Sequence, residues 1–142
     1  YSGEAREIAQ AFAALAREIR QFGNPWPAPV VLLSGGETSV TVDCAGRGGR
    51  NSEFLLALAL ALDGLPGVHA LAADSDGLDG SEDNAGAVIS PDSLSRAAAL
   101  EIPARQMLLK HDSYGFFAAL DDLLVTGPTR TNVNDFRAIL LG

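Results

Sequence analysis

The pattern of apolar and polar positions begins with a stretch that suits a helix. Residues 4–22 carry an apolar side chain at nearly every third or fourth position, with charged residues opposite, which predicts an amphipathic helix. Its apolar positions are Ile8, Phe12, Leu15 and Ile19. Residues 23–29 then combine a glycine with three prolines, so we expect an irregular linker there.

After this linker, short apolar runs alternate with helical patterns. The runs that predict strands are 30–33, 68–73, 87–89, 123–125 and 136–141. Residues 38–42 show the alternating, β-branched pattern of a strand. This strand would pair with 30–33 as a hairpin across the turn 34–37. Residues 52–63 are strong helix formers, apolar nearly all round, and should form a buried helix. Further helices are expected at 91–100 with Ser90 as N-cap, at 103–110 and at 113–121, with Asp112 and Ser113 resembling a cap pair.

Strands that alternate with helices predict an α/β fold, with a mixed β-sheet flanked by helices. A length of 142 residues suits one domain. Because the linker separates the first helix from the rest, we expect 1–27 to be a connector helix and linker from a missing N-terminal domain. Residues 28–142 would then form the α/β domain. The chain begins at Tyr1 rather than Met, which also favours a piece of a longer protein.

Composition and charge narrow the range of partners. The net charge of −8 makes nucleic acid an unfavourable partner, because an acidic surface repels phosphate backbones. No apolar run approaches the roughly 18 residues that a membrane helix needs. Cys44 is the only cysteine, so the chain forms no internal disulfide, which fits a reducing, cytoplasmic location. The oligomeric state stays open, and a homo-oligomer is one possibility.

A glycine- and arginine-rich loop, 46–51, precedes the apolar helix. Gly48 and Gly49 allow the backbone to approach a ligand, and the start of the helix directs its positive end to the same place. Arg47 and Arg50 add guanidinium groups, whose paired N–H donors suit phosphate or carboxylate. The spacing matches neither a dinucleotide fingerprint nor a Walker A loop. The alternative is a solvated turn in which Asn51 caps the helix and nearby Glu53 interacts with the helix dipole.

An acidic loop, 74–83, follows the strand at 68–73. Asp74, Asp76 and Asp79 stand where α/β proteins often place ligand sites, and they could hold Mg²⁺ or act as a general base. The EF-hand spacing is absent. The alternative is a solvated turn whose aspartates bond to the local backbone.

A third loop, 126–135, is dense in hydrogen-bonding side chains. Taken alone, it is better explained by a structured loop without function than by a site. The same holds for the turn at 34–37.

Five motifs in order carry a resemblance to a known family. They are 33–38 (LSGGET), 46–51 (GRGGRN), 74–86 (DSDGLDGSEDNAG), 112–114 (DSY) and 131–135 (TNVND). Together they resemble the MOFRL domain of the class II glycerate 2-kinases, a family in which some proteins carry the name hydroxypyruvate reductase. The resemblance extends over roughly residues 28–140. Each motif is weak alone, whereas the ordered set is specific.

This resemblance implies transfer of a phosphoryl group from ATP, with Mg²⁺, to the 2-hydroxyl of D-glycerate. It also implies a larger Rossmann-like N-terminal domain and an active site in the cleft between the two domains. Arg50 and Asp76 match the family's catalytic arginine and aspartate. A catalytic lysine attributed to the family falls in the N-terminal domain, so we expect this chain to be inactive alone.

Two departures from the family pattern are Ser52, where glutamine is usual, and Arg130, where glycine is usual. Two other functions stay open beside the kinase. One is an NAD(P)H-dependent hydroxypyruvate reductase, and the other is a noncatalytic lobe that binds a small acid or supports oligomerisation.

Overall fold

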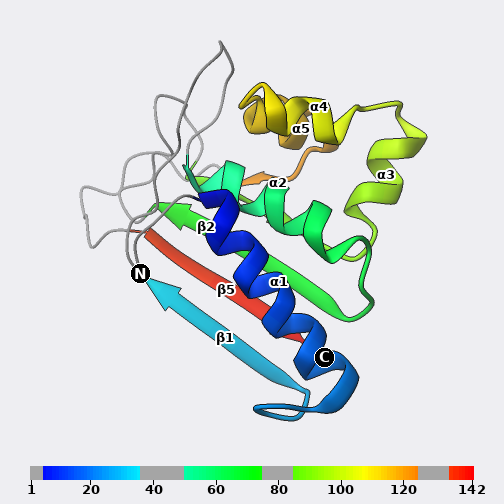
Figure 1. The fold of residues 1–142 in the computed structure, drawn as a ribbon. Coiled ribbons are helices and arrows are strands. Elements are labelled where there is room, and N and C mark those ends of the chain that lie inside the picture. Colours follow the sequence, from blue (N-terminus) through cyan, green and yellow to red (C-terminus); the bar gives the residue numbers. More distant parts are fainter. Residues whose placement is uncertain (1–4, 36–49, 75–84, 125–134) are drawn as a thin grey trace.

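The computed structural model describes residues 5–35, 50–74, 85–124 and 135–142, with Arg50 and Asp135 described by their backbone (Figure 1). In chain order the elements are α1 (Ala5–Phe22), β1 (Val30–Gly35), α2 (Arg50–Leu62), β2 (Val68–Asp74), β3 (Gly86–Ile89), α3 (Ser93–Ala99), α4 (Ala104–Leu109), α5 (Ser113–Leu120), β4 (Leu123–Leu124) and β5 (Asp135–Leu141). The predicted strand at 38–42 lies outside the described residues.

The strands form one sheet in the order β1-β5-β2-β3-β4. The expected α/β architecture, a sheet flanked by helices, is confirmed. Every pairing among the described residues is antiparallel, where a mixed sheet was expected. The reason is the position of β5. Helix α2 connects β1 to β2, which point the same way, but β5 lies between them and pairs antiparallel with both.

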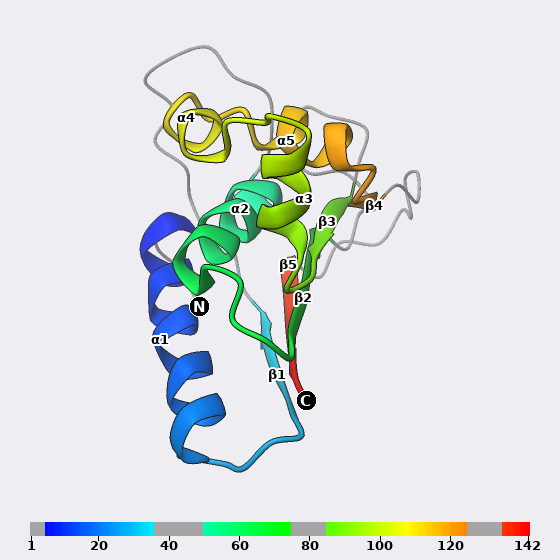
Figure 2. The ribbon, with the colours of Figure 1, turned by 90° about the vertical axis from the view of Figure 1, so that its right-hand side faces the viewer.

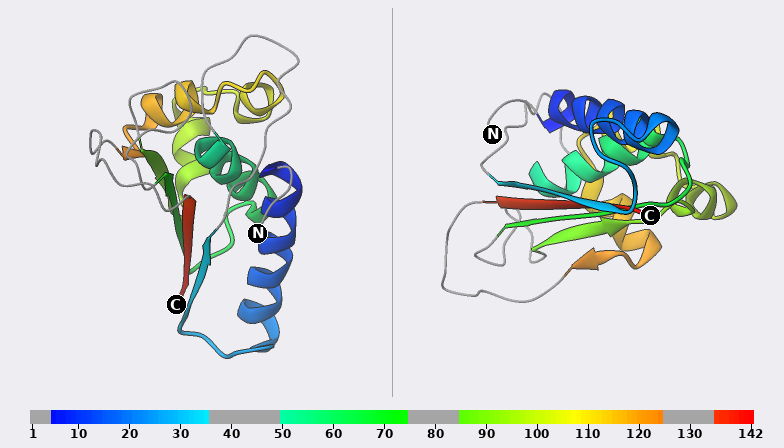
Figure 3. Two further views of the ribbon diagram at one scale, coloured as in Figure 1. Left: turned by 90° about the vertical axis from the view of Figure 1, so that its left-hand side faces the viewer. Right: turned by 90° about the horizontal axis from the view of Figure 1, so that it is seen from below.

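Helices α1 and α2 lie over one face of the sheet (Figure 2 and Figure 3). Helix α2 is enclosed between α1, the sheet and α5, and Leu58 at its centre is completely buried. The predicted burial of this helix is therefore confirmed. An apolar helix without a polar side needs apolar neighbours all round, and the fold supplies them.

Helix α1 shares the hydrophobic core with α2. Its buried residues are Ala5, Ile8, Ala9, Ala13, Ala16 and Ile19. The ring of Phe12 meets that of Phe54 edge to face, with centroids 5.9 Å apart. Residues 23–29 contain no helix or strand, as the prolines predict. That residues 1–27 act as a connector in a longer protein stays a prediction.

Two helix starts test the expected caps. Helix α3 begins at Ser93, not at residue 91, because Pro91 and Asp92 form a turn before it. Ser90 is therefore not its N-cap, and its backbone N–H donates to Ser93 Oγ at 2.9 Å instead. At α5 the expected cap is confirmed, since the Asp112 side chain accepts from the Gly115 N–H at 3.3 Å. Among the described residues, no helix has the length and apolar character to cross a membrane.

Candidate functional site

The residues that bound the predicted motif loops meet at one end of the sheet (Figure 1). Gly35, the last residue of β1, lies opposite Phe136 near the start of β5. Asp74, the last residue of β2, lies opposite Asp135. Gly86, the first residue of β3, lies beside Leu124, the last of β4. Segments 36–49, 75–84 and 125–134, which hold most of the motifs, are thus all attached at this end, here called the motif end.

The antiparallel register also explains a glycine of the third motif. A Cβ atom on Gly86 would stand 1.8 Å from the carbonyl oxygen of Ala72 in the neighbouring strand. Glycine is therefore required where the acidic segment rejoins the sheet, because β2 and β3 approach too closely for a side chain.

Helix α2 begins at the motif end, directly after the glycine- and arginine-rich segment. Arg50 is its first residue, and Asn51, Ser52 and Glu53 in the first turn are buried, with exposures of 0%, 0% and 2%. Asn51 lies inside the helix rather than before it, so the alternative of a plain N-cap is not supported. Arg47, Gly48 and Gly49 lie outside the described residues, as do Asp76 and Asp79.

Asp74 is the one member of the predicted acidic set that the structure describes. It is 5% exposed at the end of β2, and its backbone N–H donates to the Ala85 carbonyl at 2.8 Å. The register places Arg137 diagonally across from it on the same face of the sheet. A carboxylate thus lies at the motif end, within the protein rather than on a solvated turn.

Arg137 is a buried cation that lies outside the five motifs. It is 1% exposed on β5, and its Nη2 donates to Ser34 Oγ at 3.3 Å and to the Gly35 carbonyl at 3.0 Å. Its guanidinium carbon stands 5.5 Å from the ring centroid of Phe54. Arg137 therefore ties the end of β1 to the first turns of α2. The signal was its period-two spacing with Ile139 and Leu141, which puts a cation on the buried face of the strand.

A second buried polar cluster holds the first turn of α2. Glu53 Oε1 lies 2.6 Å from His111 Nδ1, and Arg6 Nε donates to Glu53 Oε2 at 3.4 Å. Arg6 Nη2 also donates to the Leu108 carbonyl at 3.0 Å. These contacts join α1, α2 and the turn before α5. The position of Glu53 in the first turn suggested an interaction with the helix dipole. Its position on a helix that is apolar nearly all round is the signal that it needs a buried partner.

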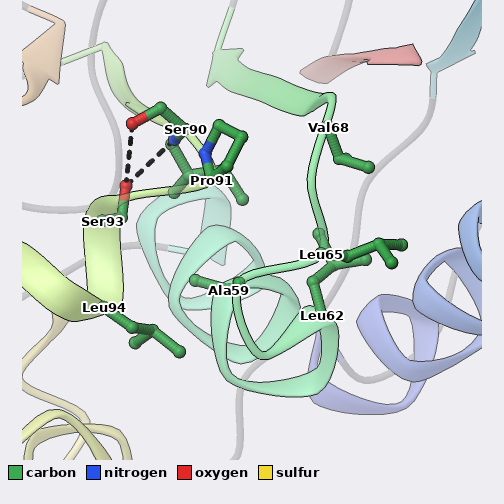
Figure 4. Close-up of a pocket in the computed structure, with 10 residues that line it drawn as sticks. Ala59, Leu62, Leu65, Val68, Ser90, Pro91, Ser93 and Leu94 are labelled. Atoms are coloured by element: carbon green, nitrogen blue, oxygen red, sulfur yellow. Dashed lines mark hydrogen bonds between the residues drawn. The ribbon is translucent and has the colours of Figure 1, made fainter. Parts of the chain in front are cut away.

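One small pocket among the described residues lies away from this end (Figure 4). It is lined by Leu62 at the end of α2, Val68 at the start of β2, and Ile89 at the end of β3. These residues stand at the opposite end of the sheet from Asp74 and Gly86. Its lining is mostly apolar, so the pocket belongs to the core and offers no group for catalysis. Within the described ranges, no cluster of three or more potential metal-ligating side chains occurs.

Comparison of the chain with known proteins shows the family to which it belongs. The MOFRL family profile matches residues 30–135. The chain belongs to the MOFRL family. A D-glycerate 2-kinase from Thermotoga maritima is 40% identical over 132 residues, which are 93% of this chain and 32% of that protein. A protein from Agrobacterium vitis named "Putative hydroxypyruvate reductase" is 58% identical over 142 residues, 99% of this chain and 37% of that protein.

The fold agrees with the family at the level of a solved structure. The crystal structure of glycerate kinase from Thermotoga maritima superposes with a TM-score of 0.96 at 38% identity, covering 100% of this chain and 34% of that one. The resemblance expected from the five motifs is thus confirmed, and the superposition includes α1. This MOFRL chain spans about a third of the length of the relatives that it matches.

Proposed function

We propose that the full-length protein is an ATP-dependent glycerate 2-kinase, in which this chain forms part of an active site shared with an N-terminal domain. The reaction transfers the γ-phosphoryl group of ATP to the 2-hydroxyl of D-glycerate, giving 2-phosphoglycerate and ADP. The observation that carries the proposal is the meeting of the motif-bounding residues at one end of the sheet. It is supported by relatives that are named glycerate kinases.

The arginine segment is assigned to charge neutralisation. Phosphoryl transfer depends mainly on positioning and on stabilising the charge that spreads over the phosphoryl oxygens. Arg50 begins α2 at the motif end, where the helix adds backbone N–H groups and the positive end of its dipole. We assign Arg50 to the transferred group or to the substrate carboxylate. Arg47, Gly48, Gly49 and Asn51 would hold phosphate or substrate oxygens.

Asp76 is assigned the role of base or positioning residue. In the reaction, the 2-hydroxyl oxygen attacks the γ-phosphorus while the bond from phosphorus to the ADP oxygen breaks. The hydroxyl proton passes to the Asp76 carboxylate. Support comes from Asp74, which stands two residues earlier in the chain and ends β2 at the motif end.

Magnesium is assigned to the carboxylates Asp74 and Asp79. Their oxygen donors suit this ion. Proteins commonly hold Mg²⁺ through one or two carboxylates and the substrate phosphates. When bound, the ion would neutralise phosphate charge.

Two coupled assays on the full-length protein test the kinase. Release of ADP is followed with ATP and D-glycerate, and absorbance at 340 nm is followed with NADH and hydroxypyruvate. We expect glycerate-dependent ADP release and no NADH oxidation. The reverse result would replace the kinase by a reductase, and inactivity in both assays would contradict both enzymes.

The reductase is the second candidate because two relatives, 58% and 55% identical, carry that name. The chain itself contains no dinucleotide fingerprint, so a reductase would need a nucleotide site elsewhere in the protein. A third reading is a noncatalytic lobe. Glycerate and ATP that produce no NMR shifts in this chain would favour it.

For the 142-residue chain alone, we expect no turnover, because it spans about a third of its relatives' length. Steady glycerate-dependent ADP release from the pure chain would contradict the shared active site.

A further inference from the structure

The face of the sheet opposite α1 and α2 (Figure 2) is here called the open face, and its exposed side chains are apolar. Its large side chains are substantially exposed: Leu33 at 79%, Val31 at 52%, Leu140 at 47%, Phe136 at 45% and Val88 at 36%. Their neighbours along the strands, such as Ile139 and Leu141, are buried beneath the helices. Both faces of the sheet are therefore apolar, whereas a sheet with one solvated face has polar side chains there.

The register gathers these side chains into adjoining rows. Val31 lies opposite Leu140, which lies opposite His69. The next row consists of Leu33, Ala138, Leu71 and Val88, and the third of Gly35, Phe136, Ala73 and Gly86. Of the residues in these three rows, His69 alone can ionise. The first two rows form an apolar patch that reaches across four strands, whereas Ala73 and Gly86 in the third row are buried. The ion pair of Arg96 with Asp122 borders the patch beside Leu71 and Val88.

An exposed apolar patch of this kind indicates a surface that contacts another part of the protein or a partner. Soluble proteins rarely expose contiguous apolar areas beyond a few hundred Å², and larger patches mark contact surfaces. Among the described residues, no helix packs on this face (Figure 3). The solved glycerate kinase that superposes on this chain has about twice as much further polypeptide, since this chain covers 34% of it.

We propose that the open face is the docking surface for the N-terminal part of the full-length protein. This inference rests on family membership and on the length of the relatives, and it does not depend on the kinase assignment. The face would bury its apolar rows against an apolar surface of that part, as two domains of one chain do.

Size and charge favour this occupant over a second copy. An interface between two domains of one chain totals roughly 600–1,500 Å². A stable interface between separate proteins takes about 800 Å² from each partner. Two copies of a chain with net charge −8 also repel each other on approach.

Hydroxyl-radical footprinting of the full-length protein tests the proposal, with mass spectrometry reading the oxidation of individual leucines. Leu100 is the internal control, because it is 60% exposed at the end of α3, away from the open face. In this chain Leu33 is the more exposed of the two. If the open face is covered, Leu33 should be oxidised roughly fivefold or more slowly than Leu100, since interface cores pack like protein interiors.

Two outcomes would overturn the proposal. Equal or faster oxidation of Leu33 means that the face is open to solvent. Protection that disappears on dilution, together with a change from dimer to monomer in light scattering, means that a second copy covers it. As an independent measurement, Leu33→Asp should lower the Tm of the full-length protein by roughly 5 °C. Leu100→Asp should leave it nearly unchanged, and equal effects of the two variants would also contradict the proposal.

Discussion

The two ends of helix α2 have opposite surroundings. Its first turn, at the motif end, buries Asn51, Ser52 and Glu53, while its second half buries Leu58 and Leu62 among apolar side chains. Both ends are almost completely excluded from solvent. They differ in what the burial achieves.

Apolar burial stabilises the fold directly, whereas buried ionic groups contribute little net stability, because removing them from water offsets much of their attraction. The Glu53–His111 pair and Arg137 are therefore better explained as groups that hold the start of α2 and the end of β1 in place. We therefore expect substitutions in the far half of α2 to act mainly on stability, and substitution of Arg50 at its start to act mainly on activity.

The largest expected effect is that of Asp76→Asn in the full-length enzyme. If Asp76 is the base, kcat falls by about 10²–10⁴-fold while the Mg²⁺ requirement stays unchanged. If it binds the metal, the Mg²⁺ requirement rises and excess metal partly restores activity. A Mg²⁺ titration at saturating ATP and glycerate separates the two roles. Unchanged kcat together with unchanged metal dependence would remove Asp76 from the site.

Leu58→Ala tests the far half of α2. Because the side chain is completely buried, the substitution leaves a cavity and should cost about 2–5 kcal/mol. Denaturant titration of the full-length protein measures this loss, with the exposed Leu100→Ala as the matched control, expected within about 0.5 kcal/mol. A loss below half a kcal/mol for Leu58→Ala would show that α2 is not the centre of the core.

Arg50→Ala tests the first turn by activity. We expect kcat/KM to fall by about 10²-fold or more, as for the loss of one preorganised donor to developing charge. Arg50→Lys keeps the charge but loses the bidentate fork, so it should also be impaired. Steady-state kinetics on both variants provide the measurement. Near-normal kinetics for both would leave the arginine segment as a turn without a role in catalysis.

Glu53→Gln sharpens the comparison at the same turn. The substitution keeps the shape but removes the charge that faces His111 and Arg6, so stability should fall by about 1.5–3 kcal/mol. Glu18→Gln, on the exposed side of α1, is the control and should change little. If both substitutions cost the same, the buried cluster does not anchor α2.

Local patterning was sufficient for most elements. The 3.6-residue repeat in α1, the apolar composition of α2 and the apolar runs of β1, β2 and β5 all predicted elements within a few residues of those observed. These features depend on neighbours in the chain, and they are visible in a short window. The start of α3 was misplaced because a proline favours both the first helical turn and the turn before it.

The sequence pattern predicted the candidate site only in part. The order of the motifs indicated the family, and the comparisons confirm it. Of the residues predicted for catalysis and binding, the structure describes Asn51 and Asp74 fully and the backbone of Arg50. The roles assigned to all eight stay proposals.

The sequence by itself determined the elements, the burial of α2 and the family, because repeat patterns and ordered motifs are written along the chain. Tertiary structure alone decided that β5 enters between β1 and β2 and makes their pairings antiparallel. It also decided that Glu53 meets His111, 58 residues away, and that Arg137 meets Gly35, 102 residues away. Such partners depend on which distant segments the folded sheet and helices bring together, which no local pattern encodes.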